Sequence, residues 1–177
     1  MRIVSTTVIG IVKNGKAAIG SDGQVTFDDT VVKHGASKVR ALWGGKILAG
    51  FAGAAADALT LFERLEEKLE DTKGNLIKAS VELAKDWRQD KVLRKLEALL
   101  AVVDQKHALI LSGTGDIIES DDGIVAVGSG ATYALAAARA LLRHTPLGPE
   151  EIVRESLKIA SEICIYTNDH FTILKVE

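Results

Sequence analysis

The chain has 177 residues, of which 47% are hydrophobic and 26% charged, and a net charge of −2. This is the balance of an ordinary globular protein, and it gives no reason to expect a nucleic acid or an anionic membrane as a partner. No apolar run approaches the roughly 18 residues that span a bilayer, and the apolar part of residues 1–5 is too short for a secretory signal. The single cysteine, Cys164, fits a reducing compartment. We therefore expect one soluble cytoplasmic domain.

The first third of the chain is predicted to be rich in β-strands. A β-branched run over residues 6–12 leads to Asn14-Gly15, the preferred dipeptide of a tight hairpin turn, and residues 16–21 return as the partner strand. The same criteria predict three further short strands, over residues 30–33, 38–43 and 46–51.

The middle of the chain then changes to a hydrophobic period of three to four residues. Leucine and phenylalanine recur at this spacing between charged residues, which predicts an amphipathic helix over residues 54–71. Asn75 is a good N-cap for a second helix that carries Trp87 on its apolar side. The remaining predicted elements are strands over residues 99–103, 107–111, 116–118 and 124–127, helices over residues 133–142 and 149–159, and a strand over residues 171–174.

The order of these elements is strands, two helices, strands, two helices and a last strand. Because hairpin turns dominate the links between strands, the sheets should be largely antiparallel. Two such sheets face to face, each with a helical pair on its outer side, would bury every apolar face. The sequence therefore predicts an α+β fold, a four-layer α-β-β-α sandwich, with residues 6–177 forming a single domain.

Four polar residues stand at the ends of these predicted strands. Thr6 begins the first strand, Asp22 follows the second, and Lys38 begins another. Ser129 lies in a Gly-Ser-Gly segment between a strand and a helix. Each residue alone is typical of a strand, a turn, a solvated surface or a loop, so no single position indicates a function.

At these positions together, the residues resemble the HslV (ClpQ) family of bacterial peptidases, which are relatives of the proteasome β subunits. The resemblance covers nearly the whole chain after Ser5. It rests on residues 6–8, 20–26, 38–40, 49–53, 56–58, 81–88, 94–100, 128–130 and 163–168. The resemblance implies a threonine endopeptidase of the N-terminal-nucleophile (Ntn) hydrolase class, which degrades unfolded or misfolded proteins.

The resemblance also implies a role for each site residue. Thr6 Oγ would attack the scissile carbonyl with the amine of Thr6 as its base, because a free α-amine has a pKa of roughly 7.7 to 8.0. Lys38 would lower the pKa of the hydroxyl and the amine through its positive charge, and Asp22 would hold Lys38 in place. Ser129 would relay protons at the amine, and the backbone N–H of Gly53 would stabilise the oxyanion.

Thr6 has a free amine only after residues 1–5 are removed. The family pattern therefore implies that residues 1–5 are a propeptide, released when Thr6 Oγ attacks the carbonyl of Ser5. It also implies a homododecamer of two stacked hexameric rings, capped by a hexameric AAA+ ATPase, HslU (ClpY), that delivers protein substrates. ATP should bind that partner, because this sequence has no Gly-x4-Gly-Lys-[Ser/Thr] loop.

No organic cofactor is expected, and the resemblance implies one ion, a monovalent cation that is typically sodium. Its ligands would be backbone oxygens of Ser161, Cys164 and Thr167, although the family usually has glycine in place of Ser161. The four histidines of the sequence show no close ligand spacing, so a zinc site is not expected.

Three other interpretations stay open at this point. Residues 124–133 imitate a dinucleotide-binding fingerprint, although Tyr133 stands at its third glycine position and the flanking strands come by hairpins. A related Ntn hydrolase or archaeal-type proteasome β subunit would keep the fold and Thr6 but work without this ATPase. A non-catalytic ring subunit would keep the fold without processing, although it would have no need of all four polar residues together.

Overall fold

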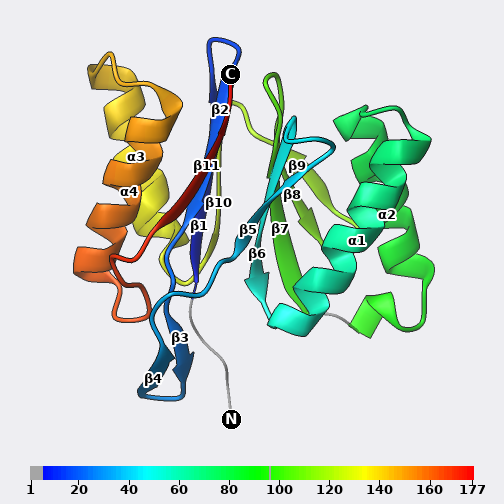
Figure 1. Ribbon diagram of the computed structural model, residues 1–177, viewed down its shortest axis with the longest axis horizontal. Coiled ribbons are helices and arrows are strands. Elements are labelled where there is room, and N and C mark those ends of the chain that lie inside the picture. The colour runs from blue at the N-terminus through cyan, green and yellow to red at the C-terminus, as the bar shows by residue number, and fades with distance from the viewer. Residues whose placement is uncertain (1–5, 96) are drawn as a thin grey trace.

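The computed structural model describes residues 6–95 and 97–177, so the predicted propeptide of residues 1–5 lies outside the described residues. Four layers lie side by side in Figure 1: a helical pair, a four-stranded sheet, a five-stranded sheet and a second helical pair. The predicted α+β four-layer sandwich is confirmed.

The four-stranded sheet contains the predicted first hairpin. All of its strands are antiparallel in the order β10-β1-β2-β11, with bounds Ile124–Gly128, Thr7–Lys13, Lys16–Ser21 and Thr172–Val176. The Asn14-Gly15 turn has φ values of 53° and 74°, the left-handed conformation that a tight hairpin requires. Thr7 pairs with Gly128 on one side and Val8 pairs with Ser21 on the other, so three chain segments meet at the start of β1.

The five-stranded sheet is also antiparallel throughout. Its order is β5-β6-β7-β8-β9, with bounds Val39–Leu42, Ile47–Gly53, Ala98–Val103, Ala108–Ser112 and Ile117–Glu119. A separate hairpin of β3 (Val25–Phe27) and β4 (Thr30–Lys33) extends beyond the two sheets near the start of β1 (Figure 1).

The helices cover the outer faces of the two sheets in pairs. Helices α1 (Ala55–Asp71) and α2 (Leu76–Gln89) lie on the five-stranded sheet, and α3 (Ala131–His144) and α4 (Pro149–Ile163) lie on the four-stranded sheet (Figure 1). Asn75 caps α2 as predicted, since its side chain accepts a hydrogen bond from the N–H of Lys78 at 3.0 Å. Pro149 is the first residue of α4, also as predicted.

Three apolar clusters hold the layers together, one between each pair of neighbouring layers. The central cluster joins the two sheets close to the start of β1. A Cβ atom on Gly50 of β6 would lie 2.5 Å from Cγ1 of Val8, so glycine is needed for the sheets to approach this closely. The packing therefore fixes the start of β1 against the five-stranded sheet.

The sequence missed β3 and the 3-10 turn η1 (Leu93–Lys95), and it misplaced several ends by one to four residues, the most at the end of α4. Both missed elements have only three residues, too few for a hydrophobic period to show. Helix α3 begins at Ala131 rather than at residue 133, directly after the Gly-Ser-Gly segment. Among the described residues, no helix combines the length and the apolar character needed to cross a membrane.

Candidate active site

Thr6 lies immediately before β1 and is only 4% exposed. Its backbone N–H donates to Oγ of Ser129 at 3.4 Å, and Ser129 Oγ donates to the carbonyl oxygen of Thr6 at 3.2 Å. The N–H of Gly130 reaches the same carbonyl at 3.4 Å. Because Ser5 precedes Thr6 in the sequence, this N–H belongs to a peptide bond. The structure thus brings together Thr6 and Ser129, two residues that the sequence singled out.

The glycines around Ser129 let its loop approach Thr6. Gly128 has a φ of 105°, which side chains rarely allow, and a Cβ atom there would collide with the Thr6 carbonyl. A Cβ atom on Gly130 would collide with Oγ1 of Thr7. The Gly-Ser-Gly segment is therefore required by close packing against the start of β1.

Asp22 follows β2 directly, and its side chain is completely buried. Its Oδ1 accepts from the N–H of Thr7 and from Lys38 Nζ, both at 2.9 Å. Its Oδ2 accepts from the N–H of Gln24 at 3.0 Å and of Asn168 at 3.4 Å. Three backbone N–H groups and the Lys38 amine therefore satisfy the oxygens of this buried side chain, as burial of a polar group requires.

Lys38 comes directly before β5 and is 4% exposed. Besides the ion pair with Asp22, its Nζ donates to the backbone oxygen of Gln24 at 2.7 Å. Burial lowers the pKa of the Lys38 ammonium below its ordinary value, while the charge of Asp22 and its hydrogen bond act against that shift. Two short hydrogen bonds, to Asp22 and to the backbone oxygen of Gln24, therefore fix the position of the Lys38 Nζ atom.

Thr7 connects two polar pairs, Thr6–Ser129 and Asp22–Lys38. Its N–H binds Asp22, and it follows Thr6, which contacts Ser129. The structure thus assembles Thr6, Asp22, Lys38 and Ser129 around one short stretch of backbone. This arrangement can place a hydroxyl nucleophile beside a proton-relaying serine and a buried positive charge, which suits acyl transfer.

Gly53 lies at the end of β6, in the segment that leads into α1. Its φ is 134°, and a Cβ atom there would lie 2.5 Å from the carbonyl oxygen of Glu97. Two residues earlier on β6, the N–H of Phe51 donates to the backbone oxygen of Lys38 at 3.1 Å, which ties β6 to the lysine. The structure therefore requires glycine at position 53, while its oxyanion role stays a prediction.

The predicted cation ligands lie at the end of α4 and in the turn that follows. Ser161 is in the last turn of the helix, Cys164 is the C-cap, and the N–H of Thr167 donates to the carbonyl of Cys164 at 3.1 Å. The Thr167 hydroxyl is 2.6 Å from that of Thr7, and the Cys164 thiol is 3.9 Å from Ser129 Oγ. This turn therefore contacts the site. Within the described part of the chain, no group of three His, Cys, Asp or Glu side chains could hold a metal ion.

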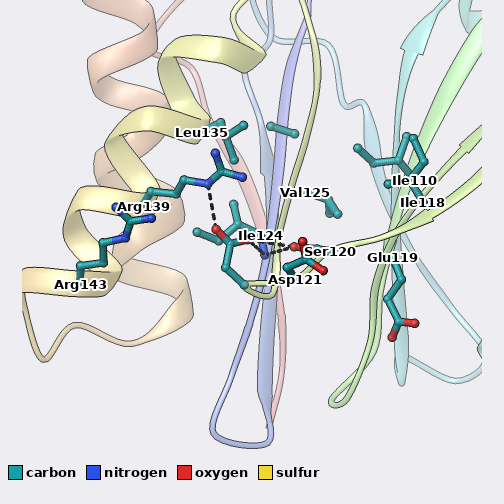
Figure 2. Close-up of a pocket in the computed structure, with 12 residues that line it drawn as sticks. Ile110, Ile118, Glu119, Ser120, Asp121, Ile124, Val125, Leu135, Arg139 and Arg143 are labelled. Carbon is teal, nitrogen blue, oxygen red and sulfur yellow. Dashed lines mark hydrogen bonds and ion pairs between the residues drawn. The ribbon is translucent and has the colours of Figure 1, made fainter.

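One cavity of the described structure lies away from these residues. A hollow of about 460 Å³ opens between α3 and the edge strands β9 and β10, where Arg139 pairs with Asp122 at 2.8 Å (Figure 2). None of the predicted site residues lines it. This cavity is therefore separate from the candidate active site.

Sequence reasoning missed four residues that build the site: Thr7, Gln24, Asn168 and the side chain of Thr167. Most of these contacts use backbone groups, or join segments more than 100 residues apart, so spacing could not reveal them. The available signal was that all four residues fall in runs that match the family, at residues 6–8, 20–26 and 163–168.

A four-layer sandwich with a threonine at the first strand, beside a buried lysine–aspartate pair and a serine, defines an Ntn hydrolase of the proteasome type. The sequence model of the family "Proteasome subunit" matches residues 4–176. The ATP-dependent protease subunit HslV of Chlorobium luteolum is 63% identical over 174 residues, which are 98% of this chain and 96% of that protein. The chain belongs to the HslV family of proteasome-type subunits.

Other relatives agree with this placement. The ATP-dependent protease subunit HslV of Aquifex aeolicus is 58% identical over 176 residues, 99% of this chain and 100% of that protein. The crystal structure of eukaryotic HslV from Trypanosoma brucei superimposes with a TM-score of 0.90 at 40% identity, covering 97% of this chain and 99% of that one. Thiobacillus denitrificans BPH, in complex with epoxomicin, has a TM-score of 0.72 at 19% identity over 97% of this chain and 98% of its own, which supports the fold alone.

Proposed function

We propose that this chain is the threonine endopeptidase subunit of an ATP-dependent, proteasome-like protease in the cytoplasm. One observation supports this most strongly. Thr6 is buried and contacts Ser129, and the next residue, Thr7, contacts Asp22 of the buried Asp22–Lys38 pair, in a chain 63% identical to an ATP-dependent protease subunit. The dinucleotide-binding alternative is wrong, because the sheets are antiparallel and lack the βαβ units of that fold.

The nucleophile in this proposal is Thr6 after removal of residues 1–5. Thr6 Oγ of the unprocessed chain attacks the Ser5 carbonyl, and hydrolysis of the resulting ester frees the Thr6 amine. That amine then takes the hydroxyl proton as Oγ attacks a substrate carbonyl. The proton passes to the leaving amine with Ser129 as relay, and water hydrolyses the acyl-enzyme ester.

The surrounding groups stabilise the charges that develop during these steps. Lys38 donates a hydrogen bond to Asp22, and the same Asp22 oxygen accepts from the N–H of Thr7, next to Thr6. The positive charge of Lys38 therefore favours the neutral amine and the alkoxide form of Thr6. The N–H of Gly53, on a backbone stretch where only glycine fits, donates to the oxyanion of the tetrahedral intermediate. Loss of one such donor costs about 10²- to 10³-fold in rate.

An ATPase partner and a ring assembly are part of the same proposal. The chain has no phosphate-binding loop of its own, so an ATP-dependent activity needs a second protein, of the hexameric AAA+ class called HslU or ClpY. We infer two stacked hexameric rings, a homododecamer whose active sites face an enclosed chamber and receive unfolded protein substrates.

A monovalent cation, sodium, is proposed at the backbone oxygens of Ser161, Cys164 and Thr167. The last turn of α4 is the negative end of the helix, where carbonyl oxygens suited to a hard cation gather, and the Cys164 carbonyl among them also accepts from the N–H of Thr167. The ion would fix the turn that contacts Thr7 and Ser129. A melting temperature that is higher in sodium chloride than in choline chloride at equal ionic strength supports this site, and equal values contradict it.

The intact mass of the purified protein tests the central proposal. Removal of residues 1–5 in the unmodified chain, with Thr6→Ala retaining them and hydrolysing no peptide, is the expected pair of results. A full-length mass for the unmodified chain in its assembled state, or peptide hydrolysis by Thr6→Ala, would support a non-catalytic subunit or another nucleophile.

A further inference from the structure

Asn168, in the turn after α4, makes hydrogen bonds to three segments of the site. Its Oδ1 accepts from the N–H of Gly23 at 3.0 Å and of His170 at 3.2 Å. Its Nδ2 donates to the backbone oxygen of His34 at 2.8 Å, and its own N–H donates to Oδ2 of Asp22 at 3.4 Å. Both ends of the side-chain amide and the backbone N–H are therefore engaged.

The bond to Gly23 bears directly on Lys38. Gly23 stands between Asp22 and Gln24, which supply the two oxygens that hold the Lys38 ammonium. A Cβ atom on Gly23 would collide with the backbone oxygen of His34, so this turn is packed against backbone on that side. The Asn168 amide thus fixes the position of the peptide between the two acceptors of Lys38.

The bond to His34 bears on the segment that carries Lys38 itself. The N–H of Ala36 donates to the backbone oxygen of Gly23 at 2.9 Å, and Lys38 follows two residues later. The Asn168 side chain therefore bridges the two segments that deliver the acceptors and the ammonium. A change in its length or donor pattern would move one relative to the other.

We propose that Asn168 is a positioning residue, which sets the distance between Lys38 and Asp22 and so the field at Thr6, without touching substrate. This inference rests on the proposed function. The amide satisfies both directions, because it accepts from Gly23 and donates to His34 with one planar group.

A carboxylate at this position would meet two acceptors. It would place negative oxygen against the carbonyl of His34 and near Asp22. Once protonated, the same carboxyl group imitates the amide, with its O–H donating to His34 and its C=O accepting from Gly23. The other charged or titratable groups around Asn168 are Lys38, Asp169, His34 and His170.

The experiment compares Asn168→Ala and Asn168→Asp in the assembled protease with its ATPase, with kcat and KM for a small fluorogenic peptide measured across pH. We expect kcat to fall at least about 10-fold in Asn168→Ala, because small misplacements of catalytic groups cost up to about 10²-fold, with KM within about twofold. In Asn168→Asp, kcat relative to the unmodified enzyme should rise as pH falls. Asp169→Ala is the control, since that side chain is 80% exposed, and its kinetics should match the unmodified enzyme.

The outcomes separate this inference from the proposed function. Normal kcat in both Asn168 variants, with Thr6→Ala inactive, overturns the inference alone. A loss in Asn168→Asp that is the same at every pH, with a lowered melting temperature, assigns Asn168 a purely structural role and also overturns it. Full peptide hydrolysis by Thr6→Ala overturns the proposed function, and this inference with it.

Discussion

The two polar pairs that meet at the start of β1 differ in how tightly the structure holds them. The carboxylate of Asp22 accepts four hydrogen bonds, and Lys38 donates two at 2.9 and 2.7 Å. The contacts between Thr6 and Ser129 are longer, at 3.4 and 3.2 Å. The Asp22–Lys38 pair is thus held by short hydrogen bonds, whereas the Thr6–Ser129 contacts have room to tighten, as catalytic hydrogen bonds commonly do when substrate binds.

The difference also bears on why a buried ion pair stands here at all. Replacement of a buried ion pair by apolar residues is often neutral or stabilising, so such a pair is weak support for a role in stability. A fixed positive charge next to a nucleophile, in contrast, lowers the pKa of that nucleophile. We interpret the Asp22–Lys38 pair as a cost that the fold bears for the reactivity of Thr6.

The largest expected effect comes from Asp22→Asn. Both carboxylate oxygens of Asp22 accept hydrogen bonds, so in either orientation the NH₂ group of asparagine would face an N–H or ammonium donor. The Lys38 ammonium would also lose its counter-ion. We expect a loss of about 3–5 kcal/mol in the free energy of unfolding, measured by chemical denaturation at fixed protein concentration.

Lys38→Met is the matched control for that measurement. It removes the buried ammonium and leaves Asp22 with three backbone N–H donors, so we expect a smaller loss of stability, about 1–3 kcal/mol, together with loss of peptidase activity. If Lys38→Met proved the more destabilising of the two, the ammonium rather than the carboxylate would be the centre of this network.

The second effect tests the looser pair. Ser129→Ala removes both contacts with Thr6, and we expect a fall in kcat of about 10²-fold, the lower end of what proton relay contributes. The melting temperature should change little, because these hydrogen bonds are long and the substitution is small. Unchanged kcat with a large fall in melting temperature would show that the Gly-Ser-Gly loop is structural only.

The third effect is the pH dependence of stability that arises from Lys38. Its pKa in the folded state lies below the ordinary 10.5 because burial disfavours the charged form. Between those two pKa values the unfolded chain binds a proton that the folded chain has released, so stability rises with pH there, by at most about 1.4 kcal/mol per pH unit. The stability of the unmodified protein relative to Lys38→Met should therefore rise with pH up to about 10.5 and stay constant, at its lower value, below the folded-state pKa. A difference that is the same across this whole range would contradict the shift.

The sequence alone predicted the four layers of helices and strands, whereas the residues of the Thr6–Ser129 and Asp22–Lys38 pairs were selected only through resemblance to a family. Hydrophobic period, the Asn14-Gly15 turn and the Asn75 cap are local signals, and each was confirmed within a few residues. Thr6 and Lys38 were selected through resemblance, since each alone is typical of ordinary structure. The contacts of Asn168 were out of reach, because they depend on backbone groups more than 130 residues away that only the fold brings near.

The smallest expected effect is at a site remote from both pairs. The Asn75 side chain caps α2 through the N–H of Lys78 at 3.0 Å, on the helical layer that covers the outer face of the five-stranded sheet. Asn75→Ala should lower the free energy of unfolding by about 1 kcal/mol, and Asn75→Gly by only a few tenths. Both should keep kcat and the removal of residues 1–5 unchanged, as intact mass and peptide hydrolysis would show. If Asn75→Ala instead reduced kcat under conditions where the protein is fully folded, the α1–α2 layer would be coupled to Thr6. The comparison between the tightly held Asp22–Lys38 pair and the looser Thr6–Ser129 pair would then have to include that layer.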